Sequence, residues 1–237
     1  MKEFRQMYLA LDFKTGEEAS RFLDDHNLYE VPVKVGMQLF YKEGPGFIKT
    51  LRENGHPIFL DLKLHDIPNT VYHAMFSLAS LGVEMVNVHA QGGKEMIRAA
   101  KQGLMDGSSG GDVPLLIAVT QLTSTDQHML QHELLVNRSM DETVAHYADL
   151  SKEAGADGVV CSVHEVEKVK HHCGNEFLTV TPGIRLKTNE NDDQKRVATP
   201  LQARIAGTDS IVIGRSVTKA EQPLINYQQI EKEWYNV

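Results

Sequence analysis

Several features that define other classes of protein are scarce in this chain of 237 residues. Its two cysteines, Cys161 and Cys173, form no Cys-x-x-Cys pair, so neither a zinc site nor a disulfide framework is indicated. No apolar run approaches the roughly 20 residues of a membrane span, and the first residues lack the long apolar stretch of a signal peptide. We therefore expect a cytoplasmic protein without membrane association.

Basic residues are outnumbered, and the common nucleotide-binding motifs are missing. The chain has 24 Lys and Arg against 32 Asp and Glu, a formal charge of −8, which argues against a general nucleic-acid-binding surface. An anionic ligand would therefore need a local positive pocket. Neither a Walker motif nor a G-x-G-x-x-G after a strand is present, and the 11 histidines include no H-E-x-x-H. We therefore predict that the protein binds no dinucleotide, nucleoside triphosphate or metal ion.

What the chain does contain is a regular alternation of two kinds of segment. Eight short apolar runs are predicted as strands, at 7–11, 31–35, 58–62, 85–88, 115–119, 158–161, 178–180 and 211–213. Most are separated by stretches of helical periodicity, such as Val71, Ala74, Met75, Leu78 and Ala79. Eight β/α units in a chain near 250 residues favour a closed (β/α)₈ barrel, with residues 1–237 as a single domain.

Two polar segments are predicted as loops. Residues 101–112 contain a Gly-Ser-Ser-Gly-Gly run and are expected to form a surface loop. The polar stretch 186–197 is expected to form a long loop after the seventh strand.

Polar residues recur where the predicted strands end, which is where barrels of this type place their active sites. They follow or close the first, second, third, fifth, seventh and eighth strands: Asp12, Lys34, Asp61, Lys63, Thr123, Ser124, Arg185, Gly214 and Arg215.

The third strand carries the densest charges. Asp61 and Lys63 are two residues apart, so their side chains point to the same side of the strand. A lysine among carboxylates is favoured in its charged form, which suits Lys63 to donate a proton. A buried ion pair that only fixes the strand is the alternative. Asp66 falls on the following turn, so periodicity does not give its direction.

The loops after the last two strands suit a phosphate group. Thr181-Pro182-Gly183-Ile184-Arg185 and Ile213-Gly214-Arg215-Ser216 combine glycine, which allows close backbone approach, with arginine, which can bind phosphate oxygens in a bidentate manner. Barrels commonly hold phosphate at these two loops, so we predict a phosphorylated substrate.

Together these motifs resemble the orotidine 5'-phosphate decarboxylase family over nearly the whole chain. The most specific element is Asp61-x-Lys63-x-x-Asp66-Ile67-Pro68-Asn69-Thr70. Supporting elements are Leu11-Asp12, Val33-Lys34-Val35-Gly36, Val88-His89-Ala90, Leu122-Thr123-Ser124 and the two phosphate loops. The resemblance implies decarboxylation of orotidine 5'-phosphate to UMP in pyrimidine synthesis, without a cofactor.

The resemblance also implies a homodimer with shared active sites and a role for each matched residue. Lys34, Asp61, Lys63 and the partner's Asp66 would form a charge relay in which Lys63 delivers the proton. Asp12 and Lys34 would hold the ribose, with Asp66 and Thr70 reaching it from across the interface. The remaining substrate contacts would be Thr123, Ser124, Pro182, Arg185, Gln194, Gly214 and Arg215, with Ser124 and Gln194 at the pyrimidine and Gln194 also at the phosphate.

Two other functions fit part of the pattern. A magnesium-dependent sugar-phosphate lyase or decarboxylase of the same superfamily resembles the chain in the Asp-x-Lys-x-x-Asp strand, but Lys34 would repel the metal ion. A non-catalytic sensor of phosphate ligands should have lost at least one of the charged residues, and none is lost.

Overall fold

The computed structural model describes residues 6–108, 110–186 and 197–235. The strands are β1 Gln6–Ala10, β2 Val33–Gly36, β3 Ile58–Leu64, β4 Met85–His89, β5 Leu115–Val119, β6 Gly158–Val160, β7 Leu178–Thr181 and β8 Ser210–Ile213. The helices are α1 Gly16–Asp25, α2 Met37–Glu43, α3 Pro45–Glu53, α4 Pro68–Ala79, α5 Gly93–Gly107, α6 Gln127–His132, α7 Met140–Glu153, α8 Val166–Cys173, α9 Pro200–Ile205, α10 Arg215–Thr218 and α11 Pro223–Tyr235. Two 3-10 turns, η1 Ala90–Gly92 and η2 Val163–Glu165, follow β4 and β6.

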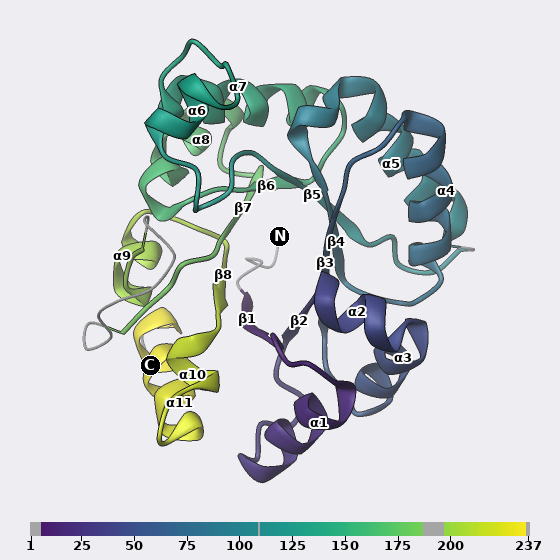
Figure 1. The fold of residues 1–237 in the computed structure, drawn as a ribbon, viewed down its shortest axis with the longest axis vertical. Coiled ribbons are helices and arrows are strands. Elements are labelled where there is room, and N and C mark those ends of the chain that lie inside the picture. The colour runs from purple at the N-terminus through teal and green to yellow at the C-terminus, as the bar shows by residue number, and fades with distance from the viewer. Residues whose placement is uncertain (1–5, 109, 187–196, 236–237) are drawn as a thin grey trace.

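The strands form a closed parallel barrel. Each strand pairs with the next along the chain, and β8 pairs with β1 to close the ring, with Met7 opposite Ile211. The helices surround this ring on the outside (Figure 1). The predicted (β/α)₈ fold is confirmed, and all eight expected strands are present near their predicted positions.

Two apolar layers explain why the strands show so little alternation in sequence. Side chains inside the barrel form a small cluster: Tyr8, Ala10, Phe59, Met85, Ile117, Val180 and Val212. Residues between these positions, such as Leu60 and Leu62, join the larger cluster shared with the helices. A strand buried on both faces reads as a nearly continuous apolar run, so a polar side chain within it is conspicuous.

The prediction of a surface loop over residues 101–112 is wrong for its first half. Helix α5 continues to Gly107. Its two late glycines lie against α4: a Cβ at Gly103 would fall 2.3 Å from the carbonyl oxygen of Tyr72, and one at Gly107 would fall 2.3 Å from that of Phe76. The glycines therefore permit close packing of α5 against α4.

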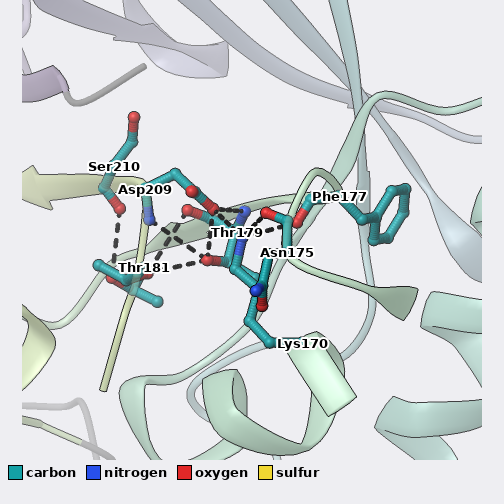
Figure 2. Close-up of polar contacts among 8 residues, drawn as sticks. Lys170, Asn175, Phe177, Thr179, Thr181, Asp209 and Ser210 are labelled. Atoms are coloured by element: carbon teal, nitrogen blue, oxygen red, sulfur yellow. Dashed lines mark hydrogen bonds and ion pairs between the residues drawn. The ribbon is translucent and has the colours of Figure 1, made fainter. Parts of the chain in front are cut away.

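The amino-terminal end of the barrel holds a set of polar contacts between β7, β8 and α8 (Figure 2). One carboxylate oxygen of Asp209 accepts hydrogen bonds from Lys170 Nζ at 2.6 Å and from the backbone N–H and hydroxyl of Thr179 at 2.7 and 2.9 Å. Lys170 also donates to the carbonyl oxygens of Asn175 and Phe177, both at 2.9 Å. We call Lys170, Thr179 and Asp209 the lower network.

Candidate active site

A pocket of about 300 Å³ opens at the carboxyl ends of the strands. That volume lies at the lower end of the range for small-molecule sites. Ten of the residues predicted from the sequence line it: Asp12, Lys34, Asp61, Lys63, Thr123, Ser124, Pro182, Arg185, Gly214 and Arg215. Apolar side chains, among them Phe59, Val119, Val160 and Val212, form its floor and walls. The barrel therefore gathers residues far apart in the sequence around one polar cavity.

An alternating row of charges crosses one side of this pocket. Lys34 Nζ lies 3.0 Å from Asp61 Oδ2, and Lys63 Nζ lies 2.5 Å from Asp61 Oδ1. Lys34 is also 3.6 Å from Asp12, which is more exposed. The predicted orientation of Asp61 and Lys63 toward the same side of β3 is thus confirmed.

The charges of this row stabilise one another. Burial alone would raise the pKa of Asp61, but the neighbouring Lys34 and Lys63 outweigh burial and lower it well below the usual range. Burial also opposes the charge on Lys34, yet Asp61 and then Asp12 raise its pKa above the ordinary value. At neutral pH the pocket therefore contains a fixed carboxylate held by cationic nitrogen.

The backbone departs from regular β structure at Lys63. Its φ of 51° lies in the left-handed region, which non-glycine residues seldom adopt. Leu60 pairs with Val86 and Leu64 pairs with Val88, so three residues of β3 stand opposite Asn87 alone. Bulges of this kind re-aim side chains, and this one lies within the charged row.

The opposite side of the pocket is formed by the loops after β7 and β8. Gly183, with φ of 80°, allows the first loop to turn, and Gly214 immediately precedes helix α10, which begins at Arg215. The backbone N–H of Arg185 donates to the carbonyl oxygen of Ala198 at 2.9 Å, and the N–H of Ala198 donates to that of Gly183 at 3.2 Å. These bonds join the two sides of the segment predicted as a long loop.

Among the described residues, two predicted site residues do not line the pocket of this chain. Asp66 and Thr70 are exposed, on the turn after β3 and in the first turn of α4. The Asp66 side chain accepts the backbone N–H of Ile67 at 2.7 Å. Gln194 lies outside the described residues.

Two polar residues of the site were missed by the sequence reasoning. Asn87 is 1% exposed and joins Asp61 to the backbone of Lys63, with both hydrogen bonds at 2.7 Å. Gln121 lines the pocket beyond the end of β5, and its buried Nε2 has no hydrogen-bond partner within the structure as described. Asn87 is two residues after Met85 and Gln121 is four residues after Ile117, and both of these apolar residues face the inside of the barrel. The two-residue periodicity that identified Asp61 could therefore have identified Asn87 and Gln121 as well.

A closed barrel with a charged pocket at the carboxyl ends of its strands is the arrangement of a (β/α)₈-barrel enzyme. Residues 5–230 match the model of the orotidine 5'-phosphate decarboxylase / HUMPS family. The chain belongs to this family, which confirms the resemblance seen in its motifs.

Individual relatives are similar over nearly their whole length. The chain is 56% identical to the orotidine 5'-phosphate decarboxylase of Bacillus cytotoxicus over 234 residues, 98% of each chain. It is 44% identical to the solved orotidine 5'-phosphate decarboxylase of Lactobacillus acidophilus, with a TM-score of 0.88 and coverage of 97% of this chain and 99% of that one. An uncharacterized conserved protein from Geobacillus kaustophilus has a TM-score of 0.85 at 50% identity, covering 96% of this chain and 99% of that one.

Proposed function

We propose that this protein decarboxylates orotidine 5'-phosphate to UMP and carbon dioxide in de novo pyrimidine synthesis, in the cytoplasm and without a cofactor. The observation that carries the proposal is the alternating row Lys34, Asp61 and Lys63 in a pocket that also contains Arg185 and Arg215. The relatives named above, with 44% and 56% identity over almost the whole chain, support the same reaction.

The chemistry is difficult because the departing carboxylate leaves its electrons in an orbital in the plane of the ring. The π system cannot delocalise them, and most decarboxylases use a cofactor as an electron sink. Here Lys63 is the proposed substitute. Its ammonium group, held beside Asp61, stabilises the developing carbanion at C6 as a preorganised cation and then protonates it.

Asp61 has a second proposed effect. Because it is anionic and fixed, it repels the substrate carboxylate that lies beside it, and this repulsion raises the energy of the bound substrate. Binding energy from elsewhere has to offset that cost. The phosphate, held by Arg185, Gly214 and Arg215, is the proposed source.

The remaining predicted residues complete the substrate site. We assign Asp12 and Lys34 to the ribose hydroxyls. Thr123, Ser124 and Pro182 are assigned to the pyrimidine end of the pocket that they line. Gln194 is assigned to the pyrimidine and the phosphate together.

Asp66 and Thr70 are proposed to act in a neighbouring subunit. Both are exposed on their own chain, close to the exposed apolar side chain of Ile67, which is 66% accessible. A homodimer that covers this segment would carry Asp66 to the far end of the partner's charged row. By symmetry each site would then be built from both chains.

The principal rival within this fold is a magnesium-dependent sugar-phosphate reaction. The Lys34 ammonium group, 3.0 Å from Asp61, occupies the space in which a cation would meet that carboxylate. A test mixes EDTA-treated protein with orotidine 5'-phosphate and follows the ultraviolet absorbance together with UMP formation. We expect full conversion. Activity that appears only when magnesium is restored would support the rival, and absence of conversion under both conditions would refute the proposed reaction.

Complementation tests the shared site. Lys63→Ala and Asp66→Asn should each be nearly inactive, but a mixed dimer keeps one site with an intact Lys63 and an intact Asp66. After random exchange of subunits, about a quarter of the wild-type activity should return. No recovery, with exchange confirmed by mass spectrometry of tagged chains, would exclude donation across the interface.

A further inference from the structure

Asn87 lies where the regular pairing of β3 and β4 is interrupted. It is the single residue of β4 between Val86 and Val88, which pair with Leu60 and Leu64. The three opposing residues of β3 cannot all form ladder hydrogen bonds with one partner. One of them, Lys63, has a left-handed backbone, so its N–H needs a partner that the regular ladder does not supply.

The side chain of Asn87 supplies that partner. Its Oδ1 accepts the backbone N–H of Lys63 at 2.7 Å, and its Nδ2 donates to Asp61 Oδ1 at 2.7 Å. The orientation of the amide is fixed by chemistry, because a backbone N–H can only donate and a carboxylate can only accept. One buried amide therefore holds both the bulge at Lys63 and the rotation of the Asp61 carboxylate.

The same carboxylate oxygen of Asp61 that accepts from Asn87 also accepts from Lys63 Nζ, at 2.5 Å. The backbone of Lys63, the carboxylate of Asp61 and the ammonium group of Lys63 thus close a ring of contacts through Asn87. Rotation of the carboxylate would break the bond to Asn87, and flattening of the bulge would break the bond to the Lys63 N–H. The ammonium group is thereby held at one place in the pocket.

The barrel itself does not require an amide at this position. Met85, two residues earlier on β4, and Ile117, opposite Asn87 on β5, are both members of the apolar cluster inside the barrel. A leucine at position 87 has nearly the shape of asparagine and would join this cluster. The amide is therefore explained by what it holds and not by the packing of the sheet.

We propose that Asn87 is a positioning residue for the decarboxylation: it fixes the Lys63 backbone and the Asp61 carboxylate so that the Lys63 ammonium group meets the reacting carbon. This inference rests on the proposed function, in which Lys63 and Asp61 act on the substrate. Asn87 itself does not line the pocket, so it acts through these two residues.

The test compares Asn87→Leu with Asn87→Asp across pH. Asn87→Leu removes both hydrogen bonds, and kcat should fall about 100-fold at every pH, the cost of a misplacement of about 1 Å. The KM should change by less than about threefold, because the phosphate contacts lie on the opposite side of the pocket. Asn87→Asp keeps the acceptor for the Lys63 N–H but loses the donor and adds a charge beside Asp61.

Protonation of the new carboxyl group would restore that donor. Burial and the neighbouring Asp61 favour the protonated form, so the kcat of Asn87→Asp relative to wild type should rise as pH falls, while that of Asn87→Leu should not. Thr179→Val, which removes a hydroxyl from the lower network, serves as the control for a purely structural loss. It should lower the melting temperature and leave kcat unchanged.

A measurement on the protein without substrate tests the positioning role of Asn87 independently of turnover. Hydrogen exchange of the Lys63 amide should be slow in wild type and faster in Asn87→Leu, with other amides of β3 unaffected. Wild-type protein that does not convert orotidine 5'-phosphate would overturn the proposed function. Active wild type with kcat of Asn87→Leu within threefold of it, or parallel pH profiles for the two variants, would overturn the role of Asn87 alone.

Discussion

Two aspartates of low exposure, each bound to lysine, lie at opposite ends of the same barrel; Asp61 is buried and Asp209 is partly buried. At the amino-terminal end, Asp209 is held by Lys170 and Thr179 in the lower network (Figure 2). At the carboxyl end, Asp61 is held by Lys34, Lys63 and Asn87, which we call the upper network. The two have similar composition and distances but different surroundings.

The difference lies in where the lysine donors are used. Lys170 donates to Asp209 and to two backbone carbonyls, which uses all three of its N–H groups within the protein. Among the described residues, Lys63 Nζ donates to Asp61 alone and lines the pocket. A lysine whose donors are all used fixes the fold, whereas one with donors directed at a cavity can act on a ligand.

The largest effect on stability is expected in the lower network. Lys170→Ala leaves the partly buried Asp209 without its cation, and the free energy of unfolding should fall by about 3 kcal/mol, the lower end of the range for a broken buried pair. The turnover of the folded protein should not change. Lys168→Ala, two residues away in α8, breaks an exposed pair with Asp141 and should cost less than about 1 kcal/mol.

Urea unfolding at fixed protein concentration measures both variants. Equal losses for Lys170→Ala and Lys168→Ala, or a fall in kcat for Lys170→Ala, would remove the distinction between the two networks.

A smaller effect is expected at the phosphate loops. Arg215→Ala should weaken substrate binding about 10- to 100-fold, the value of a hydrogen bond between charged groups. It should also lower kcat, because the phosphate is proposed to supply the energy that offsets repulsion at Asp61. Arg98→Ala, which breaks only an exposed pair with Glu95, is the control. Steady-state kinetics measure both effects. If the kcat of Arg215→Ala equals that of wild type, the phosphate contacts stabilise the bound substrate and the transition state equally, which would contradict their proposed role.

The smallest effect concerns acid stability. The folded-state pKa of Asp61 is lowered, so its ionised form contributes stability that is present above the unfolded value and is lost as pH falls. Below about pH 4 this group should reduce the free energy of unfolding by up to about 1.4 kcal/mol per pH unit. Asp61→Asn lacks this contribution, so the free energies of unfolding of wild type and Asp61→Asn should converge as the pH falls. Parallel curves from urea titrations at pH 7, 5, 4 and 3 would contradict the assignment.

Much of this arrangement could be predicted from the sequence because both faces of a barrel strand are buried. Asp61 and Lys63 interrupt an apolar run, and their spacing of two residues places them on the inner face, as the structure shows. The eight runs and their polar ends then define the pocket. The same reasoning would have identified Asn87, a polar residue in the apolar run Met85–His89, had it been applied to the uncharged side chain.

Other features depend on contacts that no local pattern reveals. The glycines Gly103 and Gly107 suggest a loop until the backbone of α4 is placed against them. The left-handed φ of Lys63 accompanies the register shift between β3 and β4. That register depends on how the two strands pair, which the sequence of β3 alone does not reveal. The direction of Asp66 depends on a second chain in the proposed dimer, so neither periodicity nor a single subunit can determine it.

The contrast between the two lysines is tested most directly by the turnover of Lys63→Ala, measured beside Lys170→Ala on folded protein. The loss of a proton donor and of its charge should lower the kcat of Lys63→Ala at least 10⁴-fold, with the barrel intact by circular dichroism. Lys170→Ala should be less stable and fully active. Near-normal decarboxylation by folded Lys63→Ala would contradict the account.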